Sequence, residues 1–116
     1  MKTRPIACLS VAAHADHAAR VSRKDEELRE EREAAWVGDA VLALFARQYV
    51  LRERGCMDGV WFTRLTSNDF LSAFGNPTRV EASIGKLYQS DGLDAAFAWM
   101  NEELIPVFLK QMKNKK

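Results

Sequence analysis

The segment from residue 34 to residue 46 most constrains the fold of this chain, because its apolar residues recur at helical spacing. The stripe consists of Trp36, Val37, Ala40, Val41, Leu44, Phe45 and, just beyond the segment, Tyr49. Residues that repeat every three to four positions share one face of an α-helix. No run of residues alternates apolar and polar side chains between turn signals, as a half-buried strand would. The sequence therefore predicts an all-α protein.

Turn and cap signals divide this all-α chain into four or five helices. A long helix should begin near Ser22 and end at Gly55, and Pro77 should open a later helix that ends before Gly92. Pro106 should kink the last helix. After a poorly defined segment over residues 5–20, the expected helices cover residues 22–54, 61–74, 77–91 and 93–112.

The composition is that of one ordinary globular domain. The chain has 116 residues, of which 47% are apolar and 28% charged, enough for a single core. A net charge of +1 creates no overall field that would attract a polyanion, so any nucleic-acid surface must be local. We expect an N-terminal segment over residues 1–21, a domain over residues 22–113 and a basic tail over residues 114–116.

Cysteine usage and the N-terminal segment favour a cytoplasmic protein. Cys8 and Cys56 are isolated in the sequence and match neither a disulfide scaffold nor a zinc knuckle. The apolar stretch over residues 6–13 is short and follows Pro5, which argues against a signal peptide. No apolar run approaches the ~18 residues needed to span a bilayer, so no membrane partner is expected.

Asp39 is the only charged residue between positions 34 and 46. Removing an ionised carboxylate from water costs several kcal/mol unless a partner, a metal or a proton compensates. If Asp39 faces other elements, it is therefore a candidate functional residue. The alternative is that Asp39 caps something or points into solvent, and the residues alone leave both possibilities open.

Two glycines inside predicted helices suggest a partner for this acid. Gly38 and Gly85 each cost their helix about 1 kcal/mol relative to alanine, and such glycines usually mark a close approach of two backbones. Contact at these glycines could bring Asp39 and Glu81 within reach of one Mg²⁺ ion. The alternative for Glu81 is a capping box that starts at Thr78.

His14 and His17 lie three residues apart with Asp16 between them. This spacing is compatible with metal binding, but no third distant ligand is evident. The role of the two histidines therefore stays open.

Three stretches together resemble the ribonuclease III family. Residues 32–40, with Trp36-Val37-Gly38-Asp39-Ala40 at their end, resemble its signature segment. Residues 64–71 resemble its Leu-Val-Ser-Asn-Glu helix. Residues 81–88 and 91–96 resemble its second catalytic segment and last helix. The three fall in the family's order, and the resemblance covers about residues 31–110.

The resemblance implies an all-helical homodimer that cleaves double-stranded RNA with Mg²⁺, for which Mn²⁺ can substitute. Asp39 and Glu81 match two of the four catalytic, metal-binding acids of the family. Ala35 and Thr78 stand where the other two acids are expected, so hydrolysis should be weak or lost. A compact branch of the family also carries alanine at the Ala35 position and still cleaves. As in the compact form, the chain includes no double-stranded-RNA-binding domain, so affinity must come from the dimer surface.

Trp36 occupies the position of the aromatic residue that the family buries in its partner subunit. The resemblance therefore implies an isologous dimer with Trp36 as its anchor, and packing of Trp36 within one subunit is the alternative. Whether the chain is an enzyme stays open. A non-catalytic RNA-binding or scaffold module of a ribonucleoprotein, or a helical interaction domain with no RNA role, would also fit the sequence.

Overall fold

A computed structural model describes residues 23–114 of the chain. All regular secondary structure in this part is helical, which confirms the all-α prediction. The chain divides into two compact units, Met1–Glu30 and Glu31–Lys116, and the packing described below is that of the second. The predicted domain boundaries at residues 22 and 113 stay predictions. The expected N-terminal segment, with His14 and His17, lies outside the described residues.

The long helix α3 spans Arg23–Arg54 and ends where the sequence predicts. Acidic residues occupy its first turn and basic residues, Arg52 and Arg54, its last, which complements the helix dipole. Gly55 follows with a φ of +75°, a conformation that glycine adopts without steric cost. The buried stripe of α3 includes Val41, Leu42, Phe45 and Tyr49.

The prediction of one helix over residues 61–74 is wrong. The structure has α4 at Gly59–Leu65, α5 at Asn68–Leu71 and a short 3₁₀ helix, η1, at Ser72–Phe74. Ser67 makes the break, because its hydroxyl donates to the carbonyl of Arg64 in α4 and accepts from the amide of Phe70 in α5. One side chain thus closes α4 and caps α5, which continuous helix would not permit.

The next helix, α6, spans Pro77–Asp91 with Asn76 as its N-cap, and Gly92 ends it with a φ of +97°. Both ends agree with the prediction. The last predicted helix is interrupted at Leu104, which separates α7 (Leu93–Glu103) from α8 (Ile105–Asn114). Pro106 explains the interruption, because it has no amide hydrogen and its ring crowds the carbonyl four residues earlier.

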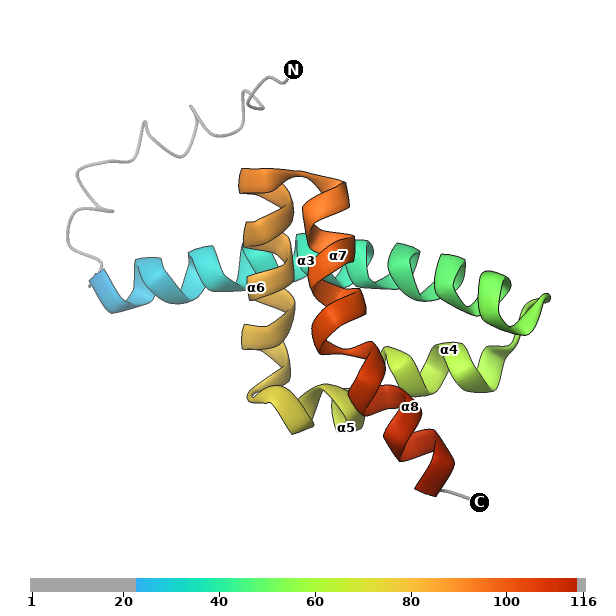
Figure 1. Cartoon of the computed structure of the whole chain (residues 1–116). Coiled ribbons are helices and arrows are strands. Elements are labelled where there is room, and N and C mark those ends of the chain that lie inside the picture. The colour runs from blue at the N-terminus through green and yellow to red at the C-terminus, as the bar shows by residue number, and fades with distance from the viewer. Residues whose placement is uncertain (1–22, 115–116) are drawn as a thin grey trace. The chain divides into compact units, whose positions relative to one another are not determined.

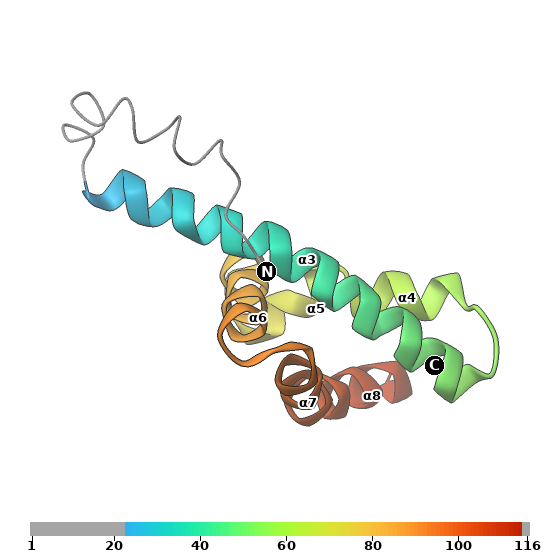
Figure 2. The same cartoon turned by 90° about the horizontal axis from the view of Figure 1, so that it is seen from above.

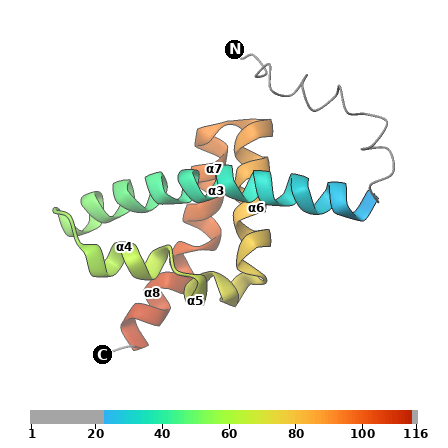
Figure 3. The same ribbon diagram turned by 180° about the vertical axis from the view of Figure 1, so that it is seen from behind.

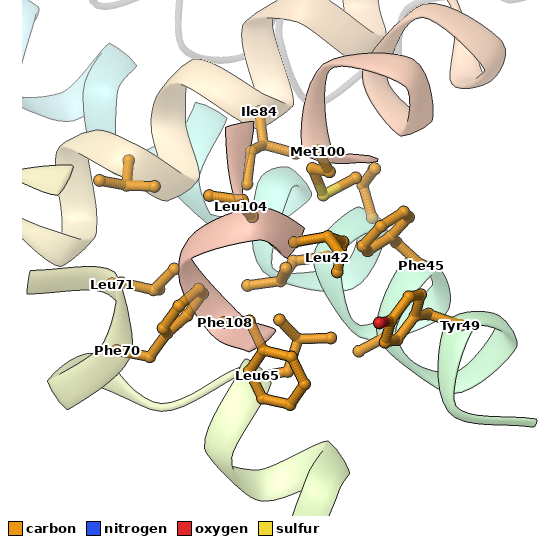
Figure 4. Close-up of a cluster of buried hydrophobic side chains, with 14 of the residues drawn as sticks. Leu42, Phe45, Tyr49, Leu65, Phe70, Leu71, Ile84, Met100, Leu104 and Phe108 are labelled. Carbon is orange, nitrogen blue, oxygen red and sulfur yellow. The ribbon is translucent and has the colours of Figure 1, made fainter. Parts of the chain in front are cut away.

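The second unit packs α6 and α7 side by side across α3, with α8 continuing from α7 (Figures 1 and 3). Figure 2 shows that α6 and α7 lie on the same side of α3. A core forms where these helices meet α4 and α5, and Phe108 of α8 sits within it (Figure 4). The Phe108 ring makes edge contacts with Tyr49, Trp61 and Phe70. The largest fully buried side chains are Phe108, Leu42, Leu65, Leu71, Ile84, Met100 and Leu104.

By length and composition, α3 could cross a membrane, contrary to the expectation from the sequence. It contains an 18-residue window with a mean hydropathy of 1.2. Half of that window is buried inside the structure, and core helices of soluble proteins pass the same test.

Candidate functional site

The candidate site is built on a crossing of α3 and α6 in which the two backbones touch at Gly38 and Gly85. A Cβ atom on Gly38 would overlap the carbonyl oxygen of Glu81 and lie 2.9 Å from the amide nitrogen of Gly85. A Cβ atom on Gly85 would overlap the carbonyl oxygen of Ala34 and lie 3.0 Å from the amide nitrogen of Gly38. Only glycine at both positions allows this approach, so the predicted contact at the two glycines is present.

Small residues extend the close approach on both helices. Ala34 and Ala35 of α3 and Ala82 of α6 form a buried cluster of their own beside the crossing. Ala35 therefore fills a packed position where the family resemblance expects an acid. Thr78, at the other such position, is exposed in the first turn of α6. Neither position supplies a charge to the site.

The crossing brings the carboxyl groups of Asp39 and Glu81 together, because each residue neighbours the contact on its own helix. Partial burial of Glu81, together with the charge and hydrogen bond of Asp39, raises the pKa of Glu81 to about 7. Glu81 is therefore about half protonated at neutral pH.

Asp39 itself is exposed, and no polar or charged side chain is buried in residues 23–114. The desolvation cost that made Asp39 conspicuous in the sequence is therefore avoided, because the residue faces solvent. Asp39 nevertheless has a specific neighbour. The sequence left open whether Asp39 faces another element or points into solvent. Both are true in part, because the side chain is exposed and also lies beside Glu81.

The capping-box interpretation of Glu81 is wrong. The side-chain oxygen of Asn76 accepts a hydrogen bond of 3.2 Å from the amide of Arg79, so Asn76 caps α6 and Thr78 lies inside the helix. Glu81 is then the fifth residue of α6, beyond the reach of the N-cap amide. Its carboxyl group is free to pair with Asp39.

The donor set of this pair fits one weakly held divalent cation. Two carboxyl groups that repel each other when both are ionised suit a hard cation with oxygen ligands. Within residues 23–114, no group of three or more His, Cys, Asp or Glu side chains could hold a metal ion. A divalent cation held by these two carboxylates would need water in its remaining coordination positions, which Mg²⁺ tolerates.

An apolar hollow of about 600 Å³ lies beside Asp39. Trp36 lines it with 80% of its surface exposed, together with Leu44 of α3, Tyr88 of α6 and Leu93 of α7. Within the part of the chain that the structure describes, Trp36 does not pack into the core, so the alternative of burial inside one subunit is wrong. A large aromatic residue left in water next to an apolar hollow is typical of an interaction surface.

A second, more polar hollow was not predicted from the sequence. It lies among η1, α6 and α7, and its volume is about 450 Å³. Trp99 and Arg79, which both line it, are 20 residues apart and belong to different helices. No local motif connects them, and only the packing of α6 against α7 brings them together.

Comparisons of the chain with protein-family models, with curated proteins and with solved structures found no match. The functional argument therefore rests on the residues and their geometry.

Proposed function

We propose that this chain is a ribonuclease III-like protein that acts on structured or double-stranded RNA in RNA processing, with a reduced acidic site. The observation that carries this proposal is the Asp39–Glu81 pair beside the Gly38–Gly85 crossing. The resemblance assigns metal binding to these two acids, and the structure brings them together from segments more than 40 residues apart in the sequence.

The role of the protein in catalysis is to hold two carboxylates at a separation that the backbone sets. A Mg²⁺ ion held by Asp39 and Glu81 would supply Lewis-acid polarisation of a phosphate and would activate a water molecule. Glu81 must release its proton before it can bind a cation as a carboxylate, so the site is most effective above neutral pH. Because Ala35 and Thr78 contribute no charge, the site carries two negative charges rather than four. Hydrolysis is therefore weak or lost.

The same proposal includes a homodimer. Trp36 and the apolar hollow lie on the face of α3 that also carries Asp39, so a second copy docked there would place two carboxylate pairs in one assembly. An isologous contact would insert each Trp36 into the hollow of the other copy. The combined surface would contact both strands of an RNA duplex.

Incubation of a structured RNA with the protein and Mg²⁺ or Mn²⁺ tests the enzymatic part. We expect slow endonucleolytic cleavage at pH 8, and loss of cleavage in Asp39→Asn and in Glu81→Gln. Glu102→Gln, which alters an exposed acid of α7, is the matched control and should cleave like the parent. Cleavage that persists unchanged in Asp39→Asn would contradict a role of this pair in hydrolysis.

The second candidate function is a non-catalytic RNA-binding or scaffold module. It is favoured by Ala35, whose methyl group is buried in the small cluster beside the crossing at a position where the resemblance expects an acid. RNA retention without divalent ions, with affinity that falls steeply with salt, together with no cleavage, would identify this function. If no RNA binds at low salt, both RNA proposals fail, and a helical interaction domain remains.

A further inference from the structure

The polar hollow among η1, α6 and α7 combines an aromatic ring with charged and hydrogen-bonding groups. Its volume of about 450 Å³ falls within the range of about 300–1,000 Å³ typical of small-molecule sites. The apolar hollow beside Trp36 has one charged lining residue, Asp39, whereas this hollow has charged lining residues of both signs, Arg79 and Glu103, beside an aromatic ring. The side chains that matter here are those of Phe74, Asn76, Arg79, Ser83, Trp99 and Glu103.

The indole ring of Trp99 provides a flat aromatic surface at this hollow. It is half-buried, packs against the main core cluster and also lines the hollow. The core contact holds the indole ring in place, while its remaining surface is accessible. A tryptophan held in this way is suited to stacking with a nucleobase, because every base has a π-face.

Arg79 provides a positive charge at the same hollow. Its side chain is 78% exposed, and its Nε lies 3.6 Å from a carboxylate oxygen of Glu31. An ion pair this exposed is weak, so an incoming phosphate can displace Glu31. The planar guanidinium of arginine binds phosphate oxygens through two parallel hydrogen bonds.

Two further groups can contact the edge of a base. Glu103 lines the hollow, and a carboxylate can accept hydrogen bonds from an exocyclic amino group. Asn76 uses its side-chain oxygen to cap α6, and its amide NH₂ keeps donor capacity. A base with an amino group, as in adenosine or cytidine nucleotides, matches this set better than uracil does.

We propose that this hollow is a nucleotide subsite, in which an amino-bearing base stacks on Trp99 and its phosphate contacts Arg79. The role of the subsite rests on the proposed action on RNA. Arg79 and Glu81 lie two residues apart on α6, and side chains at that spacing point to different faces of a helix. A nucleotide bound here would therefore hold an RNA strand on a different side of α6 from the carboxylate pair. The subsite thus binds substrate and takes no part in hydrolysis.

Tryptophan fluorescence tests the subsite directly. The double substitution Trp36→Phe/Trp61→Phe leaves Trp99 as the only tryptophan of the chain. We expect AMP to quench its emission with saturation in EDTA at low salt, and UMP to bind several-fold more weakly. Arg79→Gln should raise the Kd for AMP at least tenfold. Glu31→Gln should lower it several-fold, because the phosphate no longer competes with a carboxylate for Arg79.

Lys86→Gln, which removes an exposed charge elsewhere on α6, is the matched control and should leave the Kd unchanged within twofold. Absence of saturable quenching overturns the subsite, and so does an unchanged Kd in Arg79→Gln. Equal binding of UMP overturns the assignment of an amino-bearing base. If the double variant does not fold by circular dichroism, equilibrium dialysis of labelled AMP against the parent and Trp99→Leu decides the same question.

The EDTA condition separates this proposal from the proposed function. AMP binding without RNA cleavage would support the subsite and leave only hydrolysis in doubt. RNA cleavage without AMP binding would overturn the subsite alone.

Discussion

Asp39 and Glu81 are two acids whose properties depend on each other. In the sequence, Asp39 is notable as a lone charge among apolar residues, and Glu81 is consistent with a local cap. The structure places Asp39 in solvent beside Glu81, and this neighbour contributes to the raised pKa of Glu81. Local sequence indicates which residues could cap a helix, but only the tertiary crossing determines which carboxyl group meets which.

The proton held by Glu81 makes stability depend on pH. Its pKa is about 7 in the folded chain and about 4.5 in the unfolded chain, so the folded state binds more protons between these values. Stability should therefore be highest below about pH 4.5 with respect to this group, fall as pH rises towards 7, and stay lower above it. Glu81→Gln removes this dependence.

We expect Glu81→Gln to raise the free energy of unfolding at pH 8 and to leave it unchanged at pH 4.5. Because Glu81 is partly exposed, solvent screening limits the gain to about 1 kcal/mol. Urea denaturation at both pH values, at fixed protein concentration, measures the difference. Glu102→Gln should follow the parent at both values. A Glu81→Gln variant that is no more stable at pH 8 than the parent would contradict the raised pKa.

At the scale of helices, strong terminal signals predict the ends well. Gly55 and the Asn76-Pro77 pair mark observed boundaries, because a positive φ and a missing amide hydrogen act locally. The apolar residues keep a helical spacing across Ser67, so the spacing predicts a continuous helix where the structure has a break. The signal was present, since Ser67-Asn68-Asp69 resembles a helix start, but it competes with the apolar pattern.

The α3–α6 crossing gives a prediction at this scale. Gly38→Ala should lower the free energy of unfolding by about 3 kcal/mol, because the new methyl group would overlap the backbone at Glu81 and force the helices apart. Helix propensity alone predicts the opposite sign, a gain of about 1 kcal/mol. Thermal or urea denaturation distinguishes the two.

Gly59→Ala is the control for the crossing. Gly59 begins α4, and a Cβ atom there meets no other atom within 4 Å. Its effect should stay within about 0.5 kcal/mol. A Gly38→Ala variant that is as stable as Gly59→Ala would show that the two backbones do not touch in solution.

At the scale of the whole molecule, periodicity and caps suffice to predict the all-α class, because each helix carries its own apolar stripe. The identity of the surfaces left exposed does not follow from periodicity. Trp36 belongs to the apolar pattern of α3 like its neighbours, yet it is 80% exposed, whereas Val41 and Phe45 are buried. Only the arrangement of α6 and α7 determines which part of the stripe is covered.

We expect the parent protein to form a dimer at micromolar concentration. Trp36→Ala should raise the dimer dissociation constant at least ~30-fold, because it removes an aromatic anchor worth about 2 kcal/mol. Sedimentation equilibrium measures this constant. Met57→Ala, which truncates a side chain that is 88% exposed outside the Trp36 hollow, should dimerise like the parent. A parent that stays monomeric at high concentration, or a Trp36→Ala variant with unchanged association, would contradict the proposed interface.

The backbone contact at Gly38 and Gly85 has a consequence for redesign. Because no side chain lies between the two helices at that point, the spacing of positions 39 and 81 does not depend on which residues occupy them. Histidine or cysteine pairs installed at these two positions would inherit the same spacing. The side chains at positions 39 and 81 can thus be changed, and with them the ligands that the pair binds, while the crossing of α3 and α6 stays the same.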